Sequence, residues 1–149
     1  MESFLIAAVI CIVLVTFCST MFYEVLAHVW VNLPRLEGHP RLQIILTIMA
    51  TFVAHTVAVW VYGIAYYILD KQFGFGTLNG SITHEFIEYI YFSAVSYSSL
   101  GLGDVYPTGG LQLLVGVEAI TGLILIGWSV TFTYLVTEKY LFHRRNPHR

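Results

Sequence analysis

Charged residues are scarce in this sequence. Only 11% of its 149 residues are Asp, Glu, Lys or Arg, whereas 57% are hydrophobic. A soluble domain carries about 25% charged residues, which help to cover its surface. Because this chain lacks them, we expect its main surroundings to be a lipid bilayer. The net charge of −2 provides no basic surface for nucleic acid, so we expect no nucleic-acid partner.

Cysteine is also rare, and none of the apolar runs contains a cluster of arginines. The two cysteines, Cys11 and Cys18, lie in one apolar run. Their spacing puts both on one face of a helix, where they cannot easily form a disulfide, and we interpret them as small packing residues. The absence of an arginine-rich span excludes the gating charges of a voltage-sensing helix.

Three apolar runs are long enough to cross a bilayer as helices, which takes about 20 residues. They cover residues 3–23, 42–69 and 105–137, and the only charged residue within them is Glu118. A fourth run, residues 86–102, is shorter and breaks at glycines. Such a segment is a candidate for a re-entrant loop, which enters and leaves on one side of the membrane.

The basic residues predict the orientation of the chain. Arg35 and Arg41 lie between the first and second runs, and Lys71 follows the second. The other basic residues follow the third run: Lys139, Arg144, Arg145 and Arg149. Because basic loops stay on the cytoplasmic side, we expect a cytoplasmic C-terminus and an outer N-terminus. The re-entrant loop then lies on the outer face, and we expect the protein in the cell membrane.

The fourth run has two parts. Its first part, from residue 84, suits a helix of about three turns, which is roughly half a membrane thick. Serines then favour the end of this helix, because their side chains compete for backbone hydrogen bonds. In residues 99–104 glycine alternates with leucine, and glycine permits positive φ at every second residue. Successive carbonyls can then point the same way, as a dehydrated cation requires.

Residues 96–107, Ser-Tyr-Ser-Ser-Leu-Gly-Leu-Gly-Asp-Val-Tyr-Pro, resemble the pore loop of potassium channels. The resemblance covers residues 42–140 and is to the bacterial two-helix pore module. Together with the apolar run of residues 3–23, it predicts an all-α membrane protein with three transmembrane helices, a re-entrant pore helix and a filter loop. It also implies a homotetramer, because one chain supplies one filter strand and a closed ring of identical subunits must surround the ion.

The apolar runs and the resemblance together predict the organisation of the chain. We expect residues 1–33 as an extra N-terminal transmembrane helix, 34–41 as a cytoplasmic loop, 42–140 as the pore domain (outer helix 42–69, pore helix and filter 85–104, inner helix 109–138) and 141–149 as a cytoplasmic basic tail.

The resemblance also implies the residues of the filter. Dehydrated K⁺ would bind the backbone carbonyls of Ser99, Leu100, Gly101 and Leu102, and the Ser99 hydroxyl would complete the innermost site. Gly103, like Gly101, would permit the backbone conformation. No cofactor is implied besides the K⁺ ions, and the expected function is potassium-selective conduction rather than an enzymatic reaction.

Further residues are expected to support the filter. Asp104 would sit at the outer mouth, where it draws cations and is anchored through Tyr91. The C-terminal end of the pore helix would face the ion with its partial negative charge. Gly122 and Gly127 fall close to inner-helix glycines of the family, and each is either a packing position or a gating hinge.

Several departures from the family pattern leave a second function open. Leu102 replaces a tyrosine that braces the filter, and Leu cannot donate a hydrogen bond. A pair of pore-helix tryptophans is replaced by Tyr91 and Phe92, and an acidic residue behind the filter by Val95. A looser filter favours the alternative of a non-selective channel for monovalent cations.

A remote alternative is an enzyme. Residues 101–104 also match the Gly-x-Gly-Asp motif of intramembrane aspartyl proteases, whose chemistry requires two aspartates that share a proton. The chain contains only Asp70 and Asp104. Asp70 lacks the preceding tyrosine of those proteases, which also need more than three spans.

Three other groups in or directly after the apolar runs carry ionisable side chains. Glu118 either hydrogen-bonds the pore helix from behind the filter, or is a protonated structural acid between subunits. We interpret His55 as a packed, hydrogen-bonded histidine. Glu24 and His28 have the spacing of a ligand pair on one helix face, but two ligands are too few for a convincing metal site.

Overall fold

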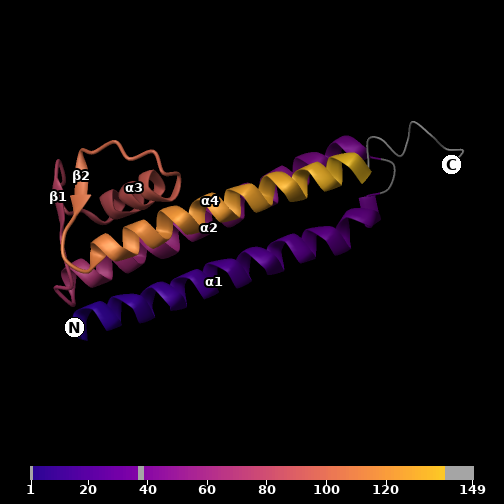
Figure 1. The fold of residues 1–149 in the computed structure, drawn as a ribbon. Coiled ribbons are helices and arrows are strands. Elements are labelled where there is room, and N and C mark those ends of the chain that lie inside the picture. The colour runs from indigo at the N-terminus through magenta and orange to yellow at the C-terminus, as the bar shows by residue number, and fades with distance from the viewer. Residues whose placement is uncertain (1, 37–38, 140–149) are drawn as a thin grey trace, which may run out of the picture.

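The fold consists of three long helices side by side, with a short helix and a small β-ladder at one end (Figure 1). The structure is a computed structural model that describes residues 2–36 and 39–139. Its elements in chain order are α1 Glu2–Asn32, the 3₁₀ turn η1 Leu33–Leu36, α2 Pro40–Lys71, β1 Leu78–Gly80, α3 Phe86–Tyr97, β2 Val105–Pro107 and α4 Leu111–Thr137.

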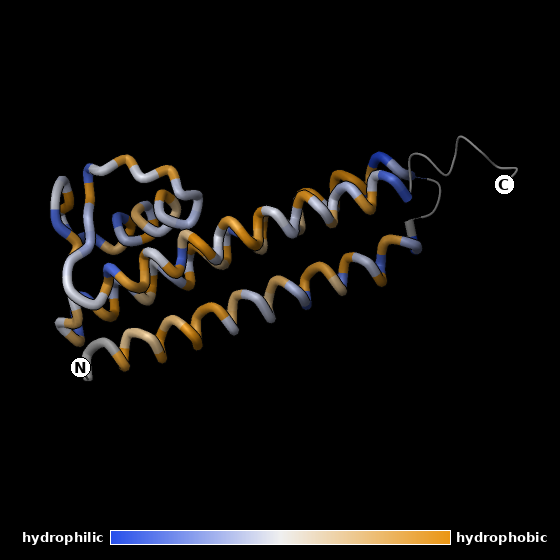
Figure 2. Tube along the Cα trace, viewed as in Figure 1, coloured by the Kyte–Doolittle hydropathy of each residue, from blue (hydrophilic) through white to orange (hydrophobic). Residues whose placement is uncertain are grey.

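Each of the three long helices can cross a membrane by length and composition. The shortest, α4, has 27 residues, which span about 40 Å at 1.5 Å per residue. Apolar residues occur along the whole length of all three helices (Figure 2), as expected for helices that contact both protein and lipid. The prediction of an all-α integral membrane protein with three long helices is therefore confirmed.

The helices begin and end within about two residues of the predicted ranges. The helix expected at 42–69 begins earlier, at Pro40, because proline suits the first turn of a helix, where its missing N–H would have no partner anyway. The predicted loop 34–41 is correspondingly shorter, since η1 occupies part of it. The predicted basic tail, 141–149, lies outside the described residues.

Gln43 fixes the connection between α1 and α2. Its side chain is 1% exposed, and its Nε2 donates a hydrogen bond of 2.9 Å to the Leu33 carbonyl in η1. A buried amide without a partner would be costly, so this bond holds η1 against the first turn of α2. Helix α1 runs along the length of the bundle and packs against both α2 and α4.

The strands β1 and β2 form a short antiparallel ladder that the sequence did not predict. Its register pairs Leu78 with Pro107, Asn79 with Tyr106 and Gly80 with Val105. Next to it, the Ser81 amide donates a hydrogen bond of 2.9 Å to the Asp104 carbonyl. The ladder therefore joins the chain that precedes α3 to the chain that follows the predicted filter, and holds both ends of this segment together.

Candidate functional site

Every second residue of the predicted filter, residues 99–103, has a positive φ. The φ angles of Ser99, Gly101 and Gly103 are 56°, 55° and 79°, and the two leucines between them do not share this conformation. Glycine adopts positive φ without steric cost, whereas Ser99 pays about 1–2 kcal/mol for it. Residues of opposite handedness that alternate along a chain turn successive carbonyls toward the same side.

The conformation of Ser99 follows from the way α3 ends. The Ser99 amide donates to the Ser96 carbonyl at 2.9 Å, and the Leu100 amide donates to the Val95 carbonyl at 3.0 Å. These two bonds form a Schellman motif, in which the residue after the helix cap takes the left-handed conformation. Serine occupies the position where glycine is usual. Helix α3 therefore passes directly into the predicted filter without a linker.

The predicted filter is uncovered in a single chain. The side chains of Leu100 and Leu102 are 64% and 56% exposed. A Cβ atom added at Gly101 or Gly103 would meet no other atom within 4 Å. Both glycines therefore face open space where a side chain would lie.

Asp104, directly after the filter, is held by α3. The Tyr91 hydroxyl donates a hydrogen bond of 3.2 Å to Asp104 Oδ2. Desolvation and the nearby Asp104 carboxylate both raise the pKa of the Tyr91 phenol, so the phenol keeps its proton and remains the donor. This is the contact expected between the two residues.

Comparison with known families identifies this arrangement of helices and loop. The pattern of a family described as "Ion channel", a module of two transmembrane helices, matches residues 44–138, which is more than half of the chain. The chain belongs to this ion channel family. Searches among curated proteins and among solved structures gave no match. The matched region begins within α2 and ends just after α4, so α1 lies outside it.

A cavity of about 260 Å³ lies between α3, residues 99–104 of the predicted filter segment, and α4. Phe92 and Val95 line it from α3, Leu102 from the filter, and Val115 and Ala119 from α4. These five side chains are apolar and contribute packing but no hydrogen bonds, whereas Tyr91, Ser96 and Asp104 add polar groups to the lining.

Glu118 lies inside the channel subunit rather than at its surface. It is fully buried and contacts α2 through Tyr66, whose hydroxyl donates to Oε2. It contacts α3 through Ser93, whose Oγ lies 2.5 Å from Oε1 and 2.8 Å from the Val59 carbonyl. The Ser93 hydroxyl has a single proton, which it can donate to the Val59 carbonyl. Its contact with Glu118 Oε1 is then a hydrogen bond only if the carboxyl of Glu118 carries a proton and donates it.

The two glycines of the inner helix have different surroundings. A Cβ atom at Gly122 would collide with the carbonyl oxygen of Tyr97, the last residue of α3. A Cβ atom at Gly127 would meet nothing within 4 Å. Close packing therefore requires glycine at 122, whereas nothing in a single chain requires it at 127.

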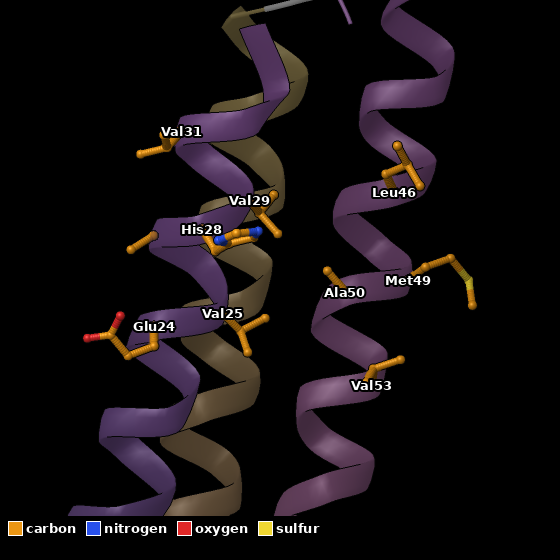
Figure 3. Close-up of a pocket in the computed structure, with 10 residues that line it drawn as sticks. Glu24, Val25, His28, Val29, Val31, Leu46, Met49, Ala50 and Val53 are labelled. Atoms are coloured by element: carbon orange, nitrogen blue, oxygen red, sulfur yellow. The ribbon is translucent and has the colours of Figure 1, made fainter. Parts of the chain in front are cut away.

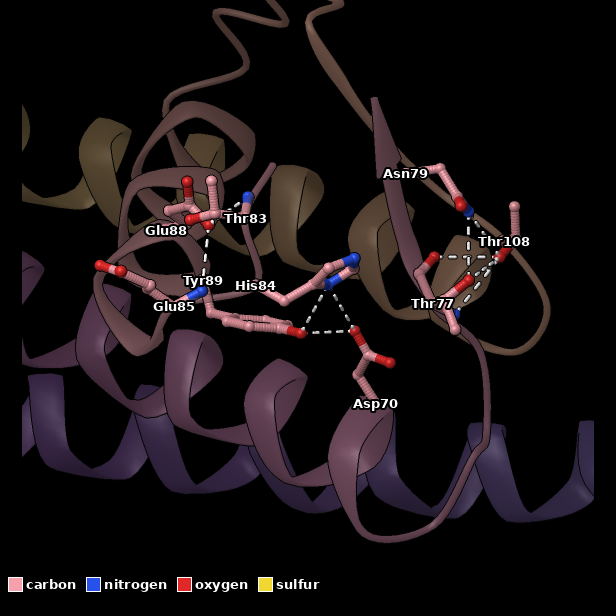
Figure 4. A network of polar contacts seen from close by, with 9 residues as sticks. All are labelled: Asp70, Thr77, Asn79, Thr83, His84, Glu85, Glu88, Tyr89 and Thr108. Atoms are coloured by element: carbon pink, nitrogen blue, oxygen red, sulfur yellow. Dashed lines mark hydrogen bonds and ion pairs between the residues drawn. The ribbon is translucent and has the colours of Figure 1, made fainter. Parts of the chain in front are cut away.

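A polar cluster holds the start of α3 against the end of α2 (Figure 4). The Tyr89 hydroxyl donates to Asp70 Oδ2 at 2.5 Å, and His84 Nδ1 lies 3.2 Å from that hydroxyl and 3.7 Å from the carboxylate. Desolvation and the bond to Asp70 raise the pKa of Tyr89. Glu85 and Glu88 add a capping box, which satisfies free amides of the first turn.

The two aspartates of the protease alternative have separate partners. Asp70 is bound by Tyr89 and Asp104 by Tyr91, and within the described residues no hydrogen bond links the two carboxylates. They do not form the proton-sharing pair that this chemistry requires.

Glu24 and His28 lie along an apolar groove of about 820 Å³ between α1 and α2 (Figure 3). The Glu24 carboxylate points away from α2 in this view. Among the described residues, no group of three side chains could hold a metal ion.

Sequence reasoning missed three features of the site. These are the left-handed Ser99, the partner Tyr66 of Glu118, and the two partners of His55 in α3 and α4, whereas the bond of Glu118 to Ser93 in α3 is one of the two arrangements expected for it. The serine run before the filter was a signal for the first. No pattern in the sequence indicated the others, because they join residues from different helices.

Proposed function

We propose that this protein is one subunit of a potassium-selective channel, in which four copies of residues 99–103 surround K⁺ on a fourfold axis. The observation that carries the proposal is the alternation of positive φ at Ser99, Gly101 and Gly103. Ring-shaped sets of carbonyls from four such strands replace the hydration shell of a cation, and no cofactor is needed.

The end of α3 supports the proposal electrostatically. The Schellman motif leads from the last turn of α3 straight into the filter, so the helix terminates beside the innermost ion site. A helix carries about half a negative charge at its C-terminus. Four such ends around one axis favour a cation at the inner end of the filter.

The exposure of the filter supports a tetramer. Uncovered backbone is not tolerated in lipid, where each unsatisfied polar group costs several kcal/mol. In a closed ring the same groups face ions and water on one side and neighbouring subunits on the other. Residues 42–140 then form the pore domain, with Asp104 at the outer mouth and the C-terminus in the cytoplasm.

A second candidate is a non-selective channel for monovalent cations. The cavity behind the filter favours it, because the apolar Val95 and Leu102 cannot brace the filter by hydrogen bonds. A filter that can widen would distinguish K⁺ from Na⁺ poorly.

The two proposals share one test of the filter. Gly101→Ala places a Cβ at φ 55°, and Gly74→Ala places one at φ 56° in the loop after α2, and neither position has another atom within 4 Å. Both changes carry the same local cost of about 1–2 kcal/mol per chain. In liposomes loaded with K⁺, we expect Gly101→Ala to abolish the flux and Gly74→Ala to retain it. Equal flux in both variants would contradict a filter at residue 101.

A further inference from the structure

His55 connects three helices in the middle of the bundle. It belongs to α2, and its Nδ1 lies 2.8 Å from the hydroxyl of Tyr97 in α3. Its Nε2 lies 2.7 Å from Oγ of Ser129 in α4. An ionisable side chain within a membrane span is costly to bury, so its partners require an explanation.

The protons of these groups fix the direction of the hydrogen bonds. Ser129 donates its single proton to the Leu125 carbonyl at 2.9 Å, so its Oγ must accept from His55 Nε2–H. A neutral imidazole with its proton on Nε2 has an acceptor at Nδ1, which the Tyr97 hydroxyl satisfies as donor. The result is one directed chain of hydrogen bonds from Tyr97 through His55 and Ser129 to the backbone of α4.

The surroundings of these hydrogen-bonded side chains are apolar. Tyr97 and Ser129 are 4% and 8% exposed, and the ring of Phe22 from α1 packs on His55 at 4.9 Å between centroids. Alternative partners are therefore scarce for each of the three side chains. A buried polar group that loses its partner in such surroundings costs free energy. This series of hydrogen bonds therefore favours one relative position of α2, α3 and α4.

Tyr97 is linked to α4 at two positions along that helix. Its carbonyl touches Gly122 directly, and its hydroxyl reaches Ser129 through His55. These contacts are seven residues apart along α4, which corresponds to about 10 Å. Tyr97 is also the last residue of α3, two positions before Ser99. A displacement of α4 therefore acts on the residue that fixes the inner end of the filter.

We propose that His55 is a positioning residue that couples the inner helix α4 to the filter. It holds Tyr97 and Ser129 at a fixed separation, so that movement of α4 changes the conformation at Ser99. This proposal rests on the channel function proposed above, and it assigns to α2 a part in gating. His55 itself contacts neither the ion nor the filter.

Single-channel recording of the full chain in planar bilayers tests the coupling. Loss of the hydrogen bonds in His55→Phe is expected to shorten the open bursts about tenfold. Tyr97→Phe removes the same link and should shorten them to a similar extent, with no further effect in the double variant. His55→Gln, whose amide offers one donor and one acceptor, should restore most of the burst length.

The matched control is Thr56→Val. Thr56 is the exposed neighbour of His55, and within the described residues its hydroxyl bonds to the Phe52 carbonyl of its own helix alone. We expect its bursts to equal those of the wild type. Independent, multiplicative effects of His55→Phe and Tyr97→Phe, or unchanged bursts in both, would overturn the proposal. Bursts can be recorded with any permeant cation, so a channel without K⁺ preference overturns the proposed function but leaves this test intact.

A second measurement does not depend on conduction. ¹⁵N NMR of histidine-labelled protein in liposomes distinguishes protonated from unprotonated ring nitrogens. The signal of His55, identified by its loss in His55→Phe, should show a protonated Nε2 and an unprotonated Nδ1. A proton on Nδ1 would contradict the directed chain of hydrogen bonds and overturn the proposal even in a channel that conducts.

Discussion

At the scale of single residues, the buried carboxyl of Glu118 depends on neutral hydrogen bonding rather than on charge. Tyr66 donates to one oxygen, and the other lies against Ser93, which also has the Val59 carbonyl within reach. Helix α2 contributes Tyr66 and Val59, α3 contributes Ser93, and α4 contributes Glu118 itself. The contact thus supports the pore helix α3 from its side rather than at its end.

Substitution of Glu118 tests this interpretation. Glu118→Gln keeps the shape, accepts from Tyr66 and donates to Ser93, so we expect a small loss of stability. Glu118→Ala leaves both hydroxyls without this partner, at a cost of about 1–3 kcal/mol for each buried group. Thermal unfolding in detergent measures the difference. An equally large loss in both variants would indicate that a charged carboxylate is required.

Gly122 tests the contact between the inner helix and the pore helix. Gly122→Ala forces a Cβ against the Tyr97 carbonyl, and such overpacking costs about 1–3 kcal/mol. Gly116→Ala in the same helix is the control, because its Cβ meets nothing within 4 Å. We expect lower thermal stability for Gly122→Ala than for the control. Equal stability of the two variants would contradict the close packing at Gly122.

Residue identities predicted the backbone conformation of residues 99–103 better than they predicted the contacts of Glu118 and His55. The glycine–leucine alternation at residues 99–103 indicated positive φ at Gly101 and Gly103, because only glycine adopts it freely. It did not indicate Ser99, whose conformation arises from the hydrogen bonds that end α3. The partners of Glu118 and His55 come from other helices, and no local pattern specifies such contacts.

At the scale of elements, α1 is attached to α4 by aromatic side chains. Phe22 and Tyr23 contact Trp128, with ring centroids 5.9 and 6.5 Å apart. Further along, Trp30 lies 6.1 Å from Phe132, and Lys139 Nζ lies 4.4 Å from the Trp30 ring. All these contacts lie at or beyond Gly127, on the half of α4 away from the filter. Helix α1 therefore restrains the part of α4 that a hinge at Gly127 would move.

Trp30→Ala tests this attachment. The change removes one aromatic pair and one cation–π contact, worth about 0.5–1.5 and 0.5–1 kcal/mol. Val31→Ala, whose side chain is 67% exposed, is the control. We expect reduced thermal stability and more frequent opening for Trp30→Ala alone. Unchanged opening together with reduced stability would show that α1 contributes packing but no restraint on the inner helix.

The elements differ in how well the sequence predicts them. Long apolar runs without charges specify α1, α2 and α4 strongly, because a membrane accepts few other structures. The strands β1 and β2 have three residues each, too few for an alternating pattern to be recognised. Their pairing joins Leu78 to Pro107 across the whole re-entrant segment, so only the three-dimensional structure reveals it.

At the scale of the whole molecule, a single chain leaves its central feature uncovered. Leu100 and Leu102 of the predicted filter are exposed, and along α4 the large apolar side chains of Ile120, Ile124 and Val130 are exposed as well. A monomer in lipid would leave the backbone of residues 99–103 uncovered, whereas the proposed ring of four would enclose it. We therefore expect native mass spectrometry of the detergent-solubilised protein to show four chains. A stable monomer or dimer would contradict the proposed pore.

The central claim is that residues 99–103 form a filter that selects K⁺. The most direct test is the reversal potential of purified wild-type protein in a planar bilayer, with K⁺ on one side and Na⁺ on the other. The account predicts a reversal potential close to the K⁺ equilibrium value, and loss of that current in Gly101→Ala. A robust current that reverses near zero would contradict selectivity for K⁺ and would favour the non-selective cation channel.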